Sequence, residues 1–178
     1  MTNKRRMLAG AVAFAAALGT QLAGAPGAGA AEAVTLHYDS SGAPDYLAQI
    51  DQAAANWNAA VQNVKLERGG SATIIFHETH DGRGSHTNTD GHGHGDIYLD
   101  SKQVDEGNDV TRIAAHEVGH NLGLPDHYEG PCSELMSGHG PGTSCKNAKP
   151  DAQESAKVDE NFANGLAAVV EQARRAVA

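Results

Sequence analysis

The segment that most constrains this chain is 111–126, which contains His116-Glu117-x-x-His120 followed by Gly123 and Asp126. Residues four apart on a helix lie on the same face, so the two imidazoles can reach one ion. Glu117 stands beside them, where a carboxylate can polarise a water on that ion. The spacing therefore predicts a helix that holds a catalytic metal.

The surrounding residues agree with a buried metal-binding helix. Gly123 is a natural left-handed stop and Pro125 prevents continuation, so Asp126 can turn its carboxylate back towards the imidazoles. Two histidines and a carboxylate with an open fourth position form a catalytic zinc set rather than a structural one. The alternative is an exposed helix with two solvated histidines, because the chain contains 10 histidines. Gly119 suits close helix packing, and the apolar back of the helix comes from Ile113, Ala114, Ala115, Val118 and Leu122.

The extended pattern is similar to that of the metzincin metalloproteases, in which a third ligand lies three residues after the glycine. That ligand is His in most of them, and here the position is Asp126. With this Asp and the downstream run Ser133-Glu-Leu-Met-Ser-Gly138, the chain resembles the snapalysins, small secreted neutral metalloproteases of streptomycetes. The resemblance extends over about 34–165.

Periodicity predicts an α+β fold. Alternating or β-branched runs predict strands and apolar residues at helical spacing predict helices. The expected strands are 34–38, 64–68, 72–76 and 96–100, and the expected helices are 46–61, about 109–122 and 151–164, with N-caps at Asp45 and Asp109. The resemblance implies a small metzincin-like domain with a twisted, mostly parallel sheet, an antiparallel edge strand, an active-site helix, a Met-turn and a C-terminal helix. The edge strand is expected at 96–100, and loops are expected at 77–95 and 102–108.

The N-terminus predicts export. Residues 1–33 combine the basic run Lys4-Arg5-Arg6, a short apolar stretch and small-residue cleavage sites after Ala30 or Ala33, which is typical of a signal peptide. A membrane anchor is the alternative. The expected organisation is a signal peptide at 1–33, a metalloprotease domain at 34–165 and a helical extension at 166–178, in a secreted, extracellular protein.

The net charge limits the kinds of partner that the protein can bind, and the two cysteines indicate the compartment in which it folds. A net charge of −9 argues against nucleic acid and anionic membranes as partners. We expect protein or peptide substrates and a monomer. Cys132 and Cys145 are expected to form a disulfide in an oxidising compartment, with free thiols or zinc binding as alternatives.

The run Asp90-Gly-His-Gly-His-Gly95 carries a second interpretation, a secreted His-rich metal-binding protein without catalysis. The simpler interpretation is a structural loop near the site, and snapalysins have a similar segment here. His94 and His139 depart from the residues that snapalysins usually have.

Four residues gain roles by resemblance. Asp109 and Thr111 match calcium ligands, although from the sequence alone Asp109 is an N-cap. Tyr128 either stabilises the transition state or closes a turn. Met136 matches the Met-turn methionine, which packs beneath the zinc ligands and does not bind the metal.

The resemblance implies a zinc endopeptidase in which His116, His120 and Asp126 bind zinc and Glu117 activates water as general base. It further implies hydrolysis of proteins such as casein, with an aromatic residue favoured after the scissile bond. A zinc hydrolase that acts on other amides is a competing class.

Overall fold

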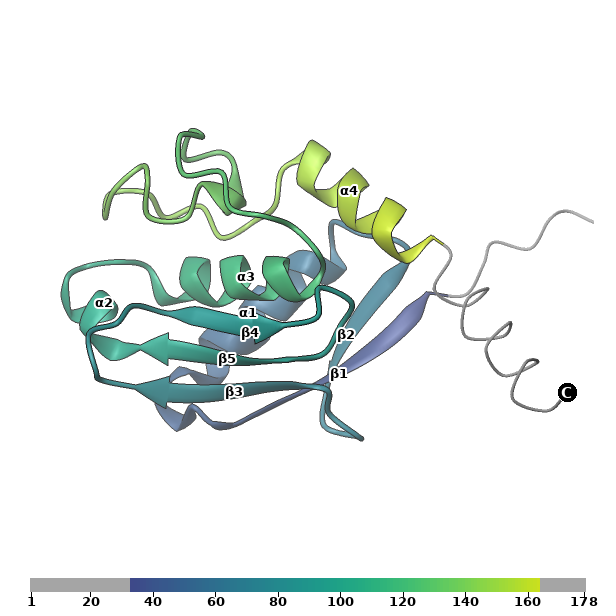
Figure 1. The fold of residues 1–178 in the computed structure, drawn as a ribbon, viewed down its shortest axis with the longest axis horizontal. Helices are drawn as coiled ribbons and strands as arrows, with labels where there is room; N and C mark the ends of the chain where they lie inside the picture. Colours follow the sequence, from purple (N-terminus) through teal and green to yellow (C-terminus); the bar gives the residue numbers. More distant parts are fainter. Residues whose placement is uncertain (1–32, 164–178) are drawn as a thin grey trace, which may run out of the picture. The chain divides into compact units, whose positions relative to one another are not determined.

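The computed structural model describes residues 33–163, and within them the predicted α+β class is confirmed (Figure 1). Residues 1–32 of the predicted signal peptide and the 166–178 extension lie outside the described residues. The strands are β1 (Val34–Gly42), β2 (Val64–Arg68), β3 (Ile74–Thr79), β4 (His86–Thr89) and β5 (Gly95–Asp100). The helices are α1 (Leu47–Asn58), α2 (Ser101–Asp105), α3 (Val110–Asn121) and α4 (Ala152–Phe162), with 3-10 turns η1 (Pro44–Tyr46) and η2 (Leu135–Ser137).

The five strands form one mostly parallel sheet in the order β2-β1-β3-β5-β4. Only β4 runs antiparallel, and it lies at the edge beside β5. The expectation that 96–100 would be the antiparallel edge was therefore wrong, because β5 pairs in parallel with β3 and lies inside the sheet.

A tight turn between β4 and β5 explains why the edge strand is antiparallel. The Asp90 carboxylate accepts the backbone N–H groups of His92 at 2.7 Å and His94 at 3.2 Å. Gly91 and Gly93 have φ of +72° and +94°, which a residue with a side chain rarely adopts. The predicted loop at 77–95 is thus partly a hairpin, and the predicted loop at 102–108 begins inside the short helix α2.

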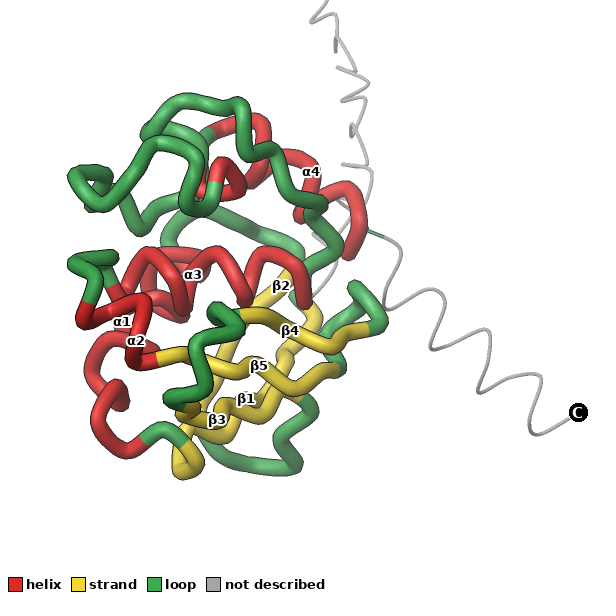
Figure 2. The backbone as a smooth tube through the Cα atoms, turned by 60° about the vertical axis from the view of Figure 1, so that its left-hand side comes forward, coloured by secondary structure: helices red, strands yellow, loops and turns green. Residues whose placement is uncertain are grey.

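One face of the sheet carries the core. Helix α1 packs on β1 and β2, α3 packs on β4 and β5, and the two helices contact each other (Figure 2). Trp57 is fully buried between them, and its indole Nε1 donates to the Ala115 carbonyl at 2.8 Å, so its predicted core role is confirmed. The segment between α3 and α4 lies on the side of α3 away from the sheet (Figures 1 and 2). In the described part of the chain, no helix has the length and apolar character needed to cross a bilayer.

The N-caps of the helices agree with the sequence signals, with one exception. Asp109 caps α3 by accepting the Arg112 N–H at 2.9 Å, and Asp151 and Glu154 form a capping box at the start of α4. The Asp45 cap was wrong, because Asp45 lies inside the turn η1 that starts at Pro44, and no side chain caps α1.

Candidate active site

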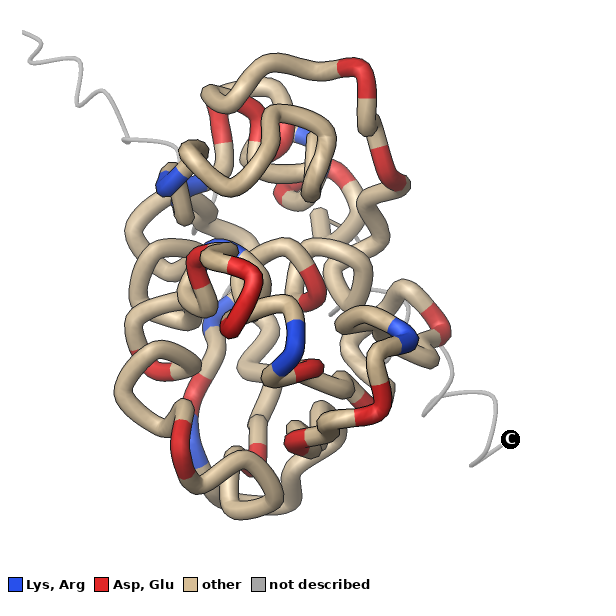
Figure 3. Tube along the Cα trace, turned by 90° about the vertical axis from the view of Figure 1, so that its left-hand side faces the viewer, with Lys and Arg blue, Asp and Glu red and all other residues tan. Residues whose placement is uncertain are grey.

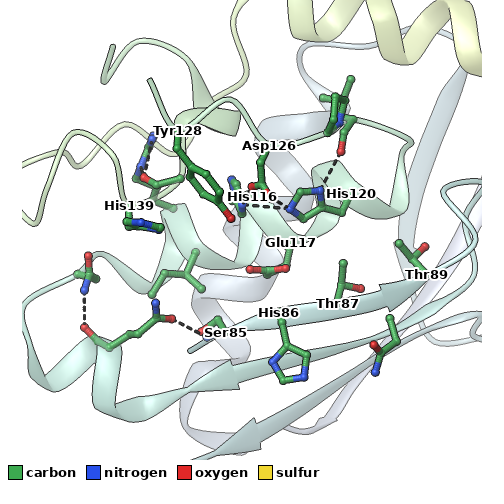
Figure 4. A pocket seen from close by; sticks show the side chains of 18 of the residues that line it. Ser85, His86, Thr87, Thr89, His116, Glu117, His120, Asp126, Tyr128 and His139 are labelled. Carbon is green, nitrogen blue, oxygen red and sulfur yellow. Dashed lines mark hydrogen bonds and ion pairs between the residues drawn. The ribbon is translucent and has the colours of Figure 1, made fainter. Parts of the chain in front are cut away.

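Helix α3 and the turn after it bring the three predicted metal ligands together (Figure 4). The Nε2 atoms of His116 and His120 lie 3.1 Å apart, and the Asp126 Oδ1 lies 3.1 Å and 3.4 Å from them. Among residues 33–163, this is the one group of three His, Cys, Asp or Glu side chains whose ligand atoms converge, all within 4.8 Å.

The Nδ1 atom of each of the two histidines fixes the orientation of its imidazole ring. His116 Nδ1 lies 3.2 Å from the Leu135 carbonyl, and His120 Nδ1 lies 2.8 Å from the Leu124 carbonyl. A carbonyl only accepts hydrogen bonds, so both Nδ1 atoms carry the proton and both Nε2 lone pairs face the centre. Two lone pairs and a carboxylate at this distance repel one another unless a cation lies between them. Two nitrogens and one oxygen fit the donor set of a zinc site.

The end of α3 places Asp126. Gly123 has φ of +87°, so the predicted left-handed stop is confirmed. The Leu124 N–H reaches back to the Gly119 carbonyl at 3.0 Å, and the His127 N–H donates to the Met136 carbonyl at 2.8 Å. The chain is therefore anchored on both sides of Asp126, which turns its carboxylate to the imidazoles.

Burial shapes the protonation of the site. Glu117 is only 4% exposed, and its Oε2 has no hydrogen-bond partner. Burial, with the nearby Asp126 charge adding to it, raises the pKa of Glu117 to about 8. Burial and the neighbouring His120 lower the pKa of His116 to about 4, which keeps its imidazole neutral and able to bind a cation.

The predicted Met-turn corresponds to the turn η2, which packs against α3 and contacts His116 through Leu135. Met136 is 3% exposed in the turn η2, and a Cβ added to Gly119 would meet its Sδ at 2.5 Å. This contact supports the prediction that Gly119 allows close packing on α3. Any side chain at position 119 would push the methionine away from the helix.

Two anchors of this turn were missed from the sequence. Arg112, 5% exposed on α3, donates to the Ser137 hydroxyl at 2.8 Å. The same guanidinium donates to the carbonyls of Glu134, Gly138 and Asn147. From α4, the Glu154 carboxylate accepts the backbone N–H groups of Leu135 and Met136. Nothing near Arg112 or Glu154 in the sequence indicates these partners, because the partners lie far away along the chain.

The disulfide between Cys132 and Cys145 is present, with Cα atoms 5.6 Å apart, and it closes a loop that contains the turn η2. Cys145 also lines the cleft. The free-thiol and zinc-ligand alternatives do not hold for this pair.

Tyr128 and His139 form one wall beside the ligands (Figure 4). The Tyr128 hydroxyl points towards Asp126 and His116, although the residue is 49% exposed. Burial of the hydroxyl, a hydrogen bond with Asp126 and the charges of Asp126 and Glu117 raise the pKa of Tyr128 to about 12. The phenol therefore stays protonated at neutral pH and remains a donor.

Within residues 33–163, the structure shows no cluster of acidic ligands at the predicted calcium site. Asp109 and Thr111 lie at the first turn of α3, where one Asp109 oxygen caps the helix. Among the described residues, Asp109 belongs to no group of three His, Cys, Asp or Glu side chains with converging ligand atoms.

The ligands open into a cleft of about 740 Å³. Residues 85–89, along β4, form one side, and α3 with residues 138–142 forms the other. The outer edge of β4 pairs with no other strand of the described sheet, so its backbone groups remain available at the cleft.

Sequence comparison decides the family. Residues 33–165 match the Streptomyces extracellular neutral proteinase (M7) family. The chain belongs to this family. Its M7 membership confirms the resemblance seen in the sequence.

Curated M7 relatives support the same assignment. The "Extracellular small neutral protease" of Streptomyces caespitosus is 54% identical over 132 residues, which cover 74% of this chain and 99% of that protein. The protein of the same name from Streptomyces sp. (strain C5) is 51% identical over 79% of this chain, but the chain spans only 62% of that relative. Among solved structures, an archaemetzincin from Methanopyrus kandleri aligns at a TM-score of 0.48 and 12% identity, covering 74% of this chain and 96% of that one.

Proposed function

We propose that this M7 protein is a secreted zinc metalloendopeptidase that hydrolyses proteins such as casein. The observation that carries the proposal is the convergence of two fixed imidazole Nε2 atoms and the Asp126 carboxylate within 4.8 Å. His116, His120 and Asp126 would hold the zinc. Export is supported by the signal-like N-terminus and by relatives named extracellular proteases.

Zinc, when bound, supplies Lewis-acid polarisation of the scissile carbonyl and makes a bound water more acidic. Glu117 takes the proton from the attacking water and passes it to the leaving amine. The Oε2 atom of Glu117 has no hydrogen-bond partner among residues 33–163, so it is free to accept that proton. The charge of a bound cation opposes the effect of burial and favours the ionised, basic form of Glu117.

Tyr128 donates a hydrogen bond to the oxygen that gains negative charge as water adds to the carbonyl. Its pKa of about 12 and the direction of its hydroxyl support this role. The alternative, a tyrosine that only closes the turn, predicts that Tyr128→Phe leaves kcat unchanged.

The substrate is an extended peptide that adds to the free edge of β4 as a further strand. The cleft runs along this edge, which supports the placement. An aromatic residue after the scissile bond is the preference carried by the family resemblance. Acidic positions are spread around the fold in Figure 3 and the net charge is −9, which supports protein substrates over nucleic acid. The protein acts as a monomer.

The deciding experiment compares casein hydrolysis by the wild type and Glu117→Gln at equal zinc content. We expect the variant to lose about 100-fold or more of kcat, in the range of general acid–base effects, while it retains zinc. Chelation of the wild type removes activity and zinc restores it. Equal activities in the two proteins would contradict the role of Glu117. If both bind zinc and neither cleaves, the His-rich metal-binding protein becomes the better description.

Calcium at Asp109 and Thr111 is a second, separate proposal, supported by two residues with oxygen-bearing side chains at the N-terminus of α3. Calcium is expected to raise the Tm of the wild type but not of Asp109→Asn, with both proteins held at saturating zinc. The absence of a calcium effect on the wild type would end the proposal.

A further inference from the structure

The cleft wall contains a contact that the proposed mechanism does not use. Tyr128 and His139 pack with ring centroids 4.7 Å apart and planes tilted by 38°. His139 belongs to the loop after the Met-turn, and its own side chain is exposed. The two residues therefore come from opposite ends of the segment that surrounds the Met-turn.

The loop backbone also contacts Tyr128, at one edge of its ring and at its carbonyl. A Cβ on Gly138 would lie 3.1 Å from the tyrosine Cε1, and a Cβ on Gly140 would lie 1.9 Å from the tyrosine carbonyl oxygen. Both glycines therefore let the loop close against Tyr128, and His139 between them presents its ring to the phenol (Figure 4).

The Gly138 backbone beside the ring and Asp126 near the hydroxyl also restrict Tyr128, yet much of the residue stays open. The residue is 49% exposed and is the one large hydrophobic side chain exposed among residues 33–163. An exposed tyrosine readily changes rotamer. A neighbouring ring at 4.7 Å favours one orientation over the others.

We propose that His139 is a positioning residue that holds the Tyr128 hydroxyl towards the His116 and Asp126 side of the cleft. This inference rests on the proposed catalytic role of Tyr128. The imidazole acts by packing and needs no particular protonation state. A planar ring of similar size at position 139 should therefore serve equally well, and a small side chain should not.

The test is a steady-state comparison on a short peptide substrate of His139→Ala, His139→Phe and Tyr128→Phe. We expect His139→Ala to lower kcat about two- to tenfold, the range of an aromatic pair, with a smaller change in KM. His139→Phe should restore kcat to within about twofold of the wild type. In the Tyr128→Phe background, His139→Ala should have no further effect, because the two residues act as a unit.

A second measurement reports directly on the environment of the Tyr128 ring. The measurement is NMR of zinc-loaded protein with isotope-labelled tyrosine, in which the Tyr128 ring signals are identified by their loss in Tyr128→Phe. These signals should shift in His139→Ala. In His139→Phe they should return towards their wild-type positions. His80→Ala, an exposed histidine outside the cleft, is the matched control and should leave kcat and these signals unchanged.

Three outcomes would overturn the inference in distinguishable ways. If Tyr128→Phe retains full kcat, the catalytic role of Tyr128 fails and the positioning role fails with it. If Tyr128→Phe is slow but His139→Ala is not, the tyrosine acts without a ring at position 139. If His139→Phe is as slow as His139→Ala, the histidine does not act by ring packing, and the inference also fails. The role of Glu117 is unaffected in each case.

Discussion

At the scale of single residues, the site depends on how each side chain is held by atoms that do no chemistry. The Nδ1 atoms of His116 and His120 are each committed to a backbone carbonyl. This leaves the Nε2 lone pairs as the free donors, as in other histidine–metal sites. The sequence spacing predicted which residues meet. It could not predict the two carbonyl partners, because Leu124 lies in the turn after α3 and Leu135 lies in the turn η2.

Asp51 gives a residue-scale prediction for pH. On α1, its carboxylate accepts from the Tyr38 hydroxyl at 2.8 Å and pairs with Arg68, whose hydrogen bond lowers the pKa of Asp51. A carboxylate with a lowered pKa stabilises the fold above its unfolded pKa of about 3.9 and loses that contribution as pH falls through the folded value. Since the Asp51 side chain is 44% exposed, we expect Asp51→Asn to cost about 0.5–1 kcal/mol at pH 7.

The measurement is urea unfolding of the wild type and Asp51→Asn between pH 7 and acid pH. The difference in unfolding free energy should shrink below about pH 4. Asp45→Asn, an exposed aspartate that caps no helix, is the control. A difference that stays constant with pH would show that ionisation of Asp51 does not stabilise the fold.

At the scale of elements, α3 both carries the two proposed histidine ligands and supports the turn η2. Its ends were predictable, because Asp109, Gly123 and Pro125 are local signals. The edge strand β4 was not, because four polar residues become a strand only when the turn at Asp90 folds them onto β5. The cap at Asp45 failed for a similar reason, since Pro44 starts a 3-10 turn first.

Arg112 gives the element-scale prediction. Arg112→Met keeps the length and apolar stem but removes the donors to the Ser137 hydroxyl and to three carbonyls. Buried acceptors without donors are costly, so we expect a loss of about 2–4 kcal/mol of unfolding free energy. Arg83→Met, at an exposed ion pair, should cost less than about 1 kcal/mol. Equal, small losses in both variants by urea unfolding would contradict a clamp between α3 and the Met-turn.

At the scale of the whole molecule, one face of α3 and the β4 edge of the sheet face each other across the cleft that holds the proposed ligands. The fold class, the zinc motif and the cysteine pair could be predicted because each is marked by spacing or composition. The Arg112 and Glu154 anchors and the packing of His139 on Tyr128 could not, because they join residues 11 to 35 positions apart through tertiary folding.

The free edge of β4 has a consequence for the proteins that such an enzyme could attack. A segment can pair with this edge only if its own amide and carbonyl groups are unpaired, whereas those in a folded target already bond to one another. In the proposed binding mode, cleavage would therefore select regions that open spontaneously, such as frayed ends and mobile loops. The susceptibility of a protein to this protease should then follow its local unfolding free energy more closely than its amino-acid sequence.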